Sequence, residues 1–213
     1  MDFIAIDFET ANPRSDSACQ IGIAVVWNNK IIESRSWLIK PPYGGFYPFY
    51  TSIHGITLDD VENEPLFDKL WETVKPYFDN TNLLIAHNAS FDINVLFNTL
   101  KLFEIAVPDL TIACTVAMAR RAWAGEQSYS LKAMAKKFDI KFLHHDAGED
   151  ARACAEIAIR VFEHYKLENI TLNAGTIDEV GRTIGIYFGY MDEHKYVNCH
   201  CRPKQKKAYH GQS

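Results

Sequence analysis

The chain has 213 residues, of which 47% are hydrophobic and 13% aromatic, so it can bury the core of one sizeable domain. Its formal net charge of −5 excludes an overall basic field that would attract nucleic acid. No apolar stretch reaches the roughly 20 residues of a membrane-spanning helix, and the first predicted strand starts at residue 2, so we expect no signal peptide. The five cysteines lack the spacing of a disulfide framework, which favours a reducing, cytoplasmic setting.

Hydrophobic periodicity and turn residues predict the elements in chain order. Three strands are expected at 2–9, 19–27 and 31–39, and Asn28-Asn29 forms the turn of an antiparallel meander. A loop rich in Pro, Gly and aromatic residues follows at 41–50. Helices and strands then alternate: helix 64–78, strand 82–86, helix 88–102, strand 109–113, a helix ending near 123, helix 130–138 and helix 149–165. This order predicts an α/β fold with a mixed sheet and helices on both of its faces.

The C-terminal part has a different character. We assign residues 1–168 to one domain and residues 169–213 to a C-terminal extension. From Lys195 onward the chain has five basic residues and no acids, which is typical of a solvated, disordered end. Cys199-His200-Cys201 with His210 allows a zinc site, but this Cys spacing is tighter than zinc sites usually have.

Four acids lie on predicted apolar faces. Asp7 and Glu9 share one face of the first strand, because side chains alternate with a period of two. Asp92 lies on the inward stripe of Val95 and Leu96. Asp150 lies in the first turn of the last helix, after a capping pair of Asp146 and Glu149. Taken alone, Asp92 and Asp150 are better explained as first-turn acids that the helix dipole favours.

Together these acids predict a metal site. An unpaired buried carboxylate is costly, and mutual repulsion adds to that cost. Divalent cations remove both penalties, and carboxylate oxygens suit Mg²⁺ or Mn²⁺ better than zinc.

Three segments resemble the motifs of a known family. Asp7-Phe8-Glu9-Thr10, His87-Asn88-Ala89-Ser90-Phe91-Asp92 and His145-x4-Asp150 are similar in type, order and spacing to the motifs of the DEDDh 3′→5′ exonucleases. Among them, the proofreading epsilon subunits of bacterial DNA polymerase III are the most similar. The resemblance covers roughly residues 1–165.

The resemblance implies an RNase H-like fold and hydrolysis of phosphodiester bonds at the 3′ end of nucleic acid, with release of nucleoside 5′-monophosphates. It implies two Mg²⁺ or Mn²⁺ ions, held by Asp7, Glu9, Asp92 and Asp150. His145 is the expected general base, because it alone keeps the family spacing to Asp150; His144 is the alternative. Single-stranded DNA is the favoured substrate, since a frayed end must enter the site, and a DNA polymerase is the partner that the resemblance suggests.

The same motifs supply five candidate substrate-binding residues: Phe8, Thr10, His87, Asn88 and Phe91. A sixth, His54, comes from Ser52-Ile53-His54-Gly55-Ile56-Thr57, which resembles the segment of the family between the first two motifs. Simpler roles compete with three of them. Phe8 also suits the core, Thr10 the end of a strand, and Asn88 the cap of the following helix.

Two other functions remain in competition. A phosphatase of the haloacid dehalogenase type has an Asp-x-Asp-x-Thr strand end, but here Glu9 replaces the second Asp and Thr10 follows it directly. A non-catalytic, polymerase-associated nucleic-acid-binding module is the third possibility, although such a module has no use for buried carboxylates. The sequence does not indicate an oligomeric state.

Overall fold

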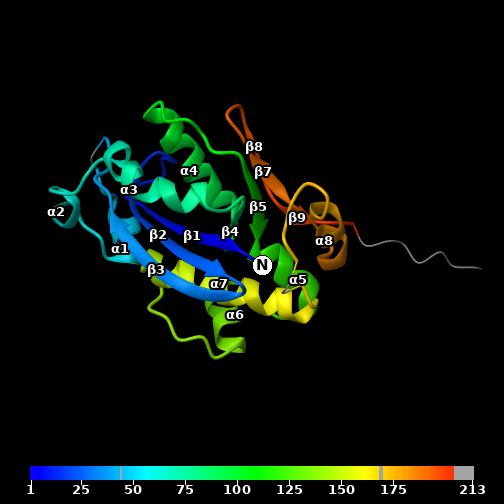
Figure 1. Ribbon diagram of the computed structural model, residues 1–213. Helices are drawn as coiled ribbons and strands as arrows, with labels where there is room; N and C mark the ends of the chain where they lie inside the picture. The colour runs from blue at the N-terminus through cyan, green and yellow to red at the C-terminus, as the bar shows by residue number, and fades with distance from the viewer. Residues whose placement is uncertain (44, 168–169, 204–213) are drawn as a thin grey trace, which may run out of the picture.

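The computed structural model describes residues 1–43, 45–167 and 170–203. Its centre is a seven-stranded sheet with the strand order β3-β2-β1-β4-β5-β7-β8, and helices cover both faces of it (Figure 1). The strands are β1 (Phe3–Thr10), β2 (Ala18–Trp27), β3 (Lys30–Leu38), β4 (Leu83–Ala86), β5 (Leu110–Cys114), β7 (Gly189–Met191) and β8 (Tyr196–Val197). A separate two-stranded sheet pairs β6 (Ile186–Tyr187) with β9 (His200–Cys201).

Of the helices that the structure describes, five follow the predicted alternation, whereas Pro48–His54, Leu58–Val61 and Ile177–Ile184 were not predicted to be helical. The helices are α1 (Pro48–His54), α2 (Leu58–Val61), α3 (Phe67–Asp79), α4 (Ser90–Leu102), α5 (Thr115–Ala122), α6 (Leu131–Lys137), α7 (Ala147–His164) and α8 (Ile177–Ile184). None of the helices in the described part of the chain has the length and apolar character needed to cross a membrane.

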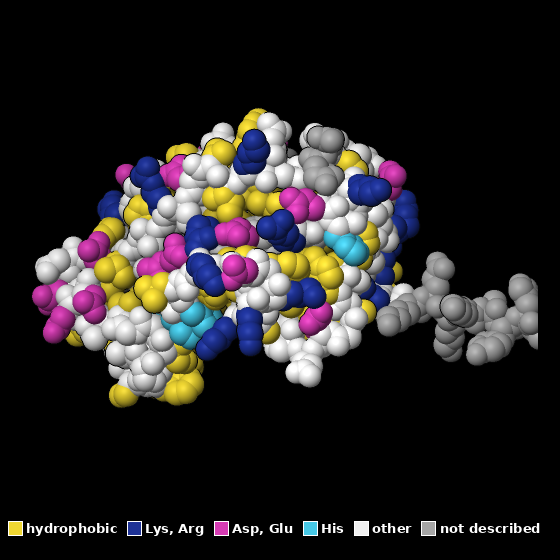
Figure 2. All heavy atoms as spheres, turned by 90° about the horizontal axis from the view of Figure 1, so that it is seen from below, with side chains coloured by type: hydrophobic (Ala, Val, Ile, Leu, Met, Phe, Trp, Pro, Cys, Tyr) yellow, Lys and Arg dark blue, Asp and Glu magenta, His cyan; other side chains and the backbone are white. Residues whose placement is uncertain are grey.

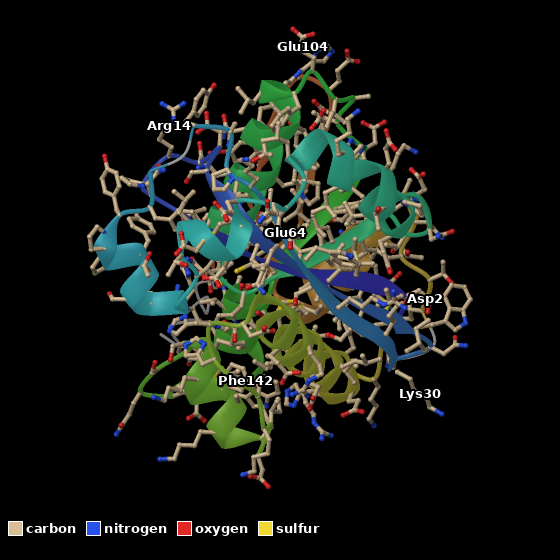
Figure 3. All side chains as sticks on the ribbon, turned by 90° about the vertical axis from the view of Figure 1, so that its left-hand side faces the viewer. Asp2, Arg14, Lys30, Glu64, Glu104 and Phe142 are labelled. Atoms are coloured by element: carbon tan, nitrogen blue, oxygen red, sulfur yellow. The ribbon has the colours of Figure 1, made fainter. Side chains whose placement is uncertain are left out.

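The sheet is mixed, as predicted. β1, β2 and β3 form an antiparallel meander, and Asn28 and Asn29 at their turn both have the positive φ that a tight hairpin requires. β4 pairs parallel to β1, and β5 pairs parallel to β4. Asp2 and Lys30 lie at one end of the meander and Arg14 lies beyond the other, where the carboxyl end of β1 is found (Figure 3).

Alternation along β1 gives the two faces of the sheet different partners. Phe3 packs edge-on against Phe162 of α7, with ring centroids 5.8 Å apart. Phe8 points to the other face and packs against Phe67 of α3, at 6.5 Å. The buried stripe of α3, which is amphipathic, covers this second face: Phe67, Leu70, Trp71, Val74 and Phe78. Asp7 and Glu9 therefore belong to the face that α7 covers.

Two local predictions are wrong. The breaker-rich segment 41–50 does not stay a loop to its end, because α1 begins at Pro48, a residue whose fixed φ suits the first helical turn. Asn88 does not cap α4: the helix begins at Ser90, its cap position is Ala89, and no side chain accepts a capping hydrogen bond. Asn88 instead adopts a left-handed conformation with φ 65°.

Residues 170–203 continue the main sheet. β7 pairs antiparallel to β5, and β8 pairs with β7. Apolar side chains from this segment, among them Val180, Ile184 and Met191, belong to the same buried core as β1 and α7. The basic residues from 204 onward and the His210 of the zinc hypothesis lie outside the described residues. The domain boundary at residue 168 stays a prediction.

Candidate active site

The carboxyl ends of β1, β4 and β5 meet at one edge of the sheet, the usual position of ligand sites in α/β folds. A cleft of about 770 Å³ opens there. Asp7 and Glu9 reach it from β1, His87 and Asn88 from the end of β4, and Asp150 from the first turn of α7. Residues more than 140 positions apart in the sequence are thus brought into one site.

Three carboxylates form the centre of this site. Asp7, Glu9 and Asp150 each offer an oxygen, and these oxygens lie within 4.8 Å of one another. The side chain of Glu9 is 12% exposed and that of Asp150 is 5% exposed. Asp92 is 1% exposed, and its Oδ1 accepts a hydrogen bond of 3.0 Å from the backbone N–H of Phe8. Asp92 therefore lies beside the cluster, anchored to the strand that carries Asp7 and Glu9.

Burial and mutual repulsion raise the pKa of these acids. Burial and the nearby Asp150 and Asp146 raise the pKa of Glu9 from 4.5 to about 8. The pKa of Asp7 is well above its ordinary value, mainly through burial and then through Asp92 and Asp150. Burial also raises the pKa of Asp92 and Asp150, against the opposing hydrogen bonds that each accepts. Burial and repulsion destabilise the ionised form of these acids, and a bound cation would relieve both. Their hard oxygen donors fit divalent cations such as Mg²⁺ or Mn²⁺.

Contacts with β2 and β3 set the position of the first turn of α7. The Asp146 side chain accepts a hydrogen bond of 3.0 Å from the N–H of Glu149, so the predicted cap is formed. Gln20 Oε1 accepts from the N–H of Ala147 at 3.2 Å, and the Ser34 hydroxyl donates to the carbonyl of Gly148 at 3.0 Å. Gly22 allows this close approach, because a Cβ there would overlap the carbonyl of Ala147.

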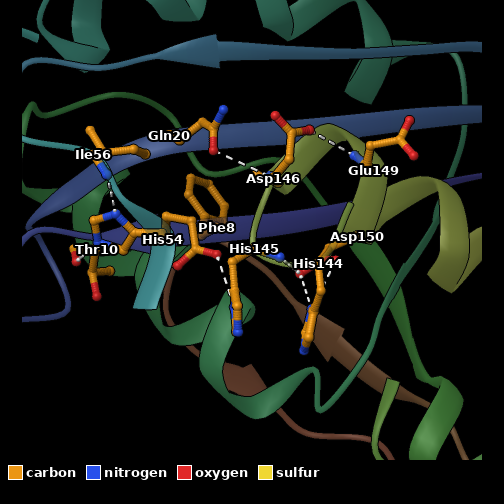
Figure 4. A network of polar contacts seen from close by, with 12 residues as sticks. Phe8, Thr10, Gln20, His54, Ile56, His144, His145, Asp146, Glu149 and Asp150 are labelled. Carbon is orange, nitrogen blue, oxygen red and sulfur yellow. Dashed lines mark hydrogen bonds and ion pairs between the residues drawn. The ribbon is translucent and has the colours of Figure 1, made fainter. Parts of the chain in front are cut away.

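Two stacked histidines form another side of the cleft (Figure 4). The rings of His144 and His145 lie 3.8 Å apart. His144 Nδ1 lies 3.1 Å from Asp150 Oδ2, whereas His145 Nδ1 lies 3.9 Å from Glu9 Oε1. His145 has φ 71°, and in this left-handed conformation its backbone N–H donates to Asp150 Oδ2 at 3.1 Å. Burial and the neighbouring His144 lower the pKa of His145, which favours a neutral ring.

A buried hydroxyl orients His87. The Nδ1 of His87 lies 2.8 Å from the hydroxyl oxygen of Thr115, a residue with no exposed surface. Burial lowers the pKa of His87 to about 4, so this imidazole stays neutral near pH 7. It can therefore serve as a hydrogen-bonding group of fixed orientation.

The six predicted substrate-binding residues divide into two groups. Phe8, His87, Asn88 and Phe91 line the cleft; Phe91 is 42% exposed, whereas Phe8 is 2% exposed and also belongs to the core. Thr10 and His54 are not among the residues that line the cleft. His54 Nε2 lies 3.2 Å from the carbonyl of Thr10, and its Nδ1 accepts from Ile56 N–H, so this ring connects α1 to the end of β1 (Figure 4).

The cleft also includes residues that the sequence did not indicate. One wall comes from α5, the loop that follows it and the start of α6, and Ile53 of α1 completes the lining. This wall consists of Val116, Arg120, Ser128, Tyr129, Ser130 and Leu131. One signal was available: α5 directly follows β5, so its first turns had to lie at the same sheet edge as Asp7.

Comparison with known proteins identifies the family. The model of the RNase T exonuclease family matches residues 4–158, which is more than half of the chain and spans all of the motifs above. The chain belongs to this exonuclease family. Membership confirms the resemblance to DEDD-type 3′→5′ exonucleases and sets the phosphatase interpretation aside.

Individual relatives agree with this assignment. The chain is 30% identical to the DNA polymerase III subunit epsilon of Treponema pallidum, over 78% of this chain and 79% of that protein. It is 29% identical to the PolC-type DNA polymerase III of Caldanaerobacter subterraneus subsp. tengcongensis, over 81% of this chain. The chain spans only 12–19% of the length of that polymerase and several other curated relatives.

The fold agrees as well. A solved structure of exonuclease X in complex with 5′ overhanging duplex DNA superposes with a TM-score of 0.62 at 26% identity, and covers 76% of this chain and 91% of the other. The RNase H-like fold prediction is confirmed by this likeness and by the mixed sheet.

Proposed function

We propose that this protein is a metal-dependent 3′→5′ exonuclease that releases nucleoside 5′-monophosphates from the 3′ end of nucleic acid. The observation that carries the proposal is the convergence of Asp7, Glu9 and Asp150 on one cleft, with their oxygens within 4.8 Å of one another. Family membership gives this acid cluster its reaction class.

In this proposal Asp7, Glu9, Asp92 and Asp150 hold two ions, Mg²⁺ or Mn²⁺. When bound, such ions activate water and stabilise the charge of the leaving oxygen. The protein supplies fixed geometry. The N–H of Phe8 holds Asp92, the N–H of His145 holds Asp150, and the rigid pairing of β1 with its neighbours sets the separation of Asp7 from Glu9.

His145 acts as the general base. Two observations support this role: the lowered pKa of His145 favours a neutral ring, and its Nδ1 lies 3.9 Å from Glu9 Oε1, beside the acids that would hold the ions. His144, in contact with the carboxylate of Asp150, orients that ligand and stacks on the ring of the base.

The cleft suits the end of a single strand. Phe91 and Ile53 offer apolar surface on which a terminal base can pack, and aromatic stacking contributes about 1–3 kcal/mol per base. Single-stranded DNA is the substrate we propose, although phosphate chemistry alone does not select DNA over RNA. The PolC-type and epsilon relatives support association with a DNA polymerase, and cytoplasmic location goes with that role.

The test uses matched DNA and RNA oligonucleotides that carry a label at the 5′ or the 3′ end. We expect stepwise shortening from the 3′ end in Mg²⁺ or Mn²⁺, release of 5′-monophosphates, and no reaction in EDTA. Asp7→Asn should lower the rate by at least about 10³-fold, because it removes a charged ligand from the centre of the site. Degradation from the 5′ end, or full activity in EDTA, would contradict the proposal.

The histidine pair gives a second prediction. His145→Ala should lower kcat by about 10²–10⁴-fold, as expected for loss of a general base. His144→Ala should lower it much less, because the backbone N–H of His145 still holds Asp150. Single-turnover rates of both variants at saturating Mg²⁺ make the comparison, and a larger loss in His144→Ala would reverse the two roles.

A further inference from the structure

An arginine without an acidic partner lies in the same cleft as the acids. Arg120 is exposed in the last turn of α5, and its side chain lines the cleft together with Asp7 and Glu9. Its guanidinium lies 5.8 Å from the ring centroid of Tyr129, and it forms no ion pair within the described part of the chain. Arg120 therefore offers an unpaired guanidinium to the same cleft that the carboxylates line.

The ring beneath Arg120 is itself fixed. The hydroxyl of Tyr129 donates to the carbonyl of Trp123 at 2.9 Å and accepts from the N–H of Gly125 at 3.1 Å. Trp123 in turn packs against Phe138, with ring centroids 4.6 Å apart. Tyr129 therefore provides a rigid surface in the lining of the cleft, and the cation–π contact holds the guanidinium against it.

The arginines of α7 behave differently. On α7, Arg152 pairs with Glu149 and Glu156, and Arg160 pairs with Glu163. Basic and acidic side chains are interspersed over the face shown in Figure 2, without a broad basic patch. The chain as a whole has a net charge of −5, so affinity for a polyanion should come from a few well-positioned cations. Arg120 is such a cation, because it pairs with no acid in the described part of the chain.

We propose that Arg120 binds the phosphodiester one linkage upstream of the scissile bond, a proposal that rests on the exonuclease function above. The acids and their cations account for the scissile phosphate. A strand that leaves the site must carry its next phosphate along the wall of the cleft, and a planar guanidinium binds the two free oxygens of such a group in a bidentate manner. Arg120 thus selects polymeric substrates and is a positioning residue for the strand.

The experiment compares two substrates that differ in this upstream phosphate. The p-nitrophenyl ester of thymidine 5′-phosphate has a single phosphodiester, and p-nitrophenolate leaves where the upstream nucleotide would leave. An oligothymidylate has the upstream phosphate as well. We expect Arg120→Ala to lower kcat/KM for the oligonucleotide by about 10- to 100-fold, mainly through KM, because a hydrogen bond to a charged group is lost. Hydrolysis of the p-nitrophenyl ester should change less than about twofold.

A third substrate locates the contact. A methylphosphonate at the second linkage from the 3′ end removes the negative charge at that phosphate alone. In the first turnover, the methylphosphonate should lower kcat/KM of the wild-type protein by about the factor that Arg120→Ala causes on the native strand. In Arg120→Ala, the methylphosphonate should cause no further decrease in kcat/KM. Arg120→Lys should recover part of the affinity, and Arg160→Ala, on the outer face of α7, serves as the matched control.

The other possible outcomes distinguish a failure of the Arg120 proposal from a failure of the exonuclease function. Equal losses on the ester and the oligonucleotide would overturn the proposal and give Arg120 a structural or catalytic role. A methylphosphonate effect that persists in full in Arg120→Ala would overturn it by placing the contact elsewhere. If wild-type protein hydrolyses neither substrate in Mg²⁺, the exonuclease function itself fails, which the variants do not need to show.

Discussion

The protonation of Glu9 makes the stability of the folded protein depend on pH. Its pKa rises to about 8 because the side chain is buried beside Asp150 and Asp146. Without metal, the folded protein therefore keeps a proton that the unfolded chain releases near 4.5. At this group the folded state binds more protons between these two values, so the contribution of Glu9 to stability must fall as pH rises through that range.

The direction of this pH dependence can be measured by thermal unfolding. Because the lowered pKa of His87 acts in the opposite direction, the effect of Glu9 is measured against Glu9→Gln. In EDTA, raising the pH from 5 to 8 should lower the Tm of the wild type relative to that of Glu9→Gln, and each kcal/mol corresponds to about 2–4 °C for a chain of this size. Mg²⁺ should raise the Tm at pH 8, because a bound cation favours the ionised acids. Glu9→Gln should flatten the pH dependence and weaken the Mg²⁺ response, since the titrating group is gone. An unchanged slope in Glu9→Gln would assign the effect to other groups.

The acids of the site could be predicted from the sequence, whereas the wall of the cleft that includes Arg120 and Tyr129 could not. Asp7 and Glu9 were found because charge on an apolar strand face is anomalous. Arg120 carries no such anomaly: an arginine in the last turn of an amphipathic helix is ordinary, and its place in the cleft depends on where Tyr129 comes to lie. The contact of His144 with Asp150 was equally hidden, since spacing favoured His145.

The element that decides the site is α7, because its first turn brings Asp150 to the two acids of β1. Gly22 of β2 makes this docking possible through its missing side chain. Gly22→Ala should push the start of α7 away from the sheet, lower the free energy of unfolding by about 1–3 kcal/mol and weaken Mg²⁺ binding. Denaturant unfolding and calorimetric titration of Mg²⁺ test this, with Gly175→Ala in an exposed loop as control. Unchanged Mg²⁺ affinity in Gly22→Ala would show that the position of Asp150 does not depend on this contact.

Long elements with clear periodicity were predictable, and short ones were not. The meander, β4, β5 and α7 follow from alternation or from an apolar stripe. By contrast, α1 follows a run of Pro and Gly that resembles a loop, and β6 to β9 are two or three residues long, too short for any period to be visible. β7 forms on the open edge of β5 and β8 pairs with β7, whereas β6 and β9 pair only with each other, so all four depend on tertiary contacts.

At the scale of the whole molecule, the C-terminal segment closes the sheet. β7 occupies the edge of β5, and the ring of Tyr196 packs against Phe97 of α4 at 5.2 Å, while its hydroxyl donates to Asn94. This continuity predicts that residues 170–203 and the exonuclease core unfold together.

Tyr196→Ala tests the prediction. It should lower the free energy of unfolding by about 1–3 kcal/mol and shift the whole transition. Tryptophan fluorescence, which reports on Trp27, Trp37, Trp71 and Trp123 outside the segment, should give the same midpoint as circular dichroism. Tyr190→Ala, on a partly exposed ring, serves as control. Two separate transitions would instead support an independent C-terminal unit.

The two hydrogen bonds that tie α7 to the meander have a further consequence. Gln20 and Ser34 belong to β2 and β3, and β3 is the outermost strand of the sheet, yet both hold the turn that carries Asp150. A random mutagenesis screen for catalytically impaired clones should thus recover substitutions on this peripheral strand as well as in the cleft. Homologues that remodel the rim of their sheet would have to change the helix start in step with it.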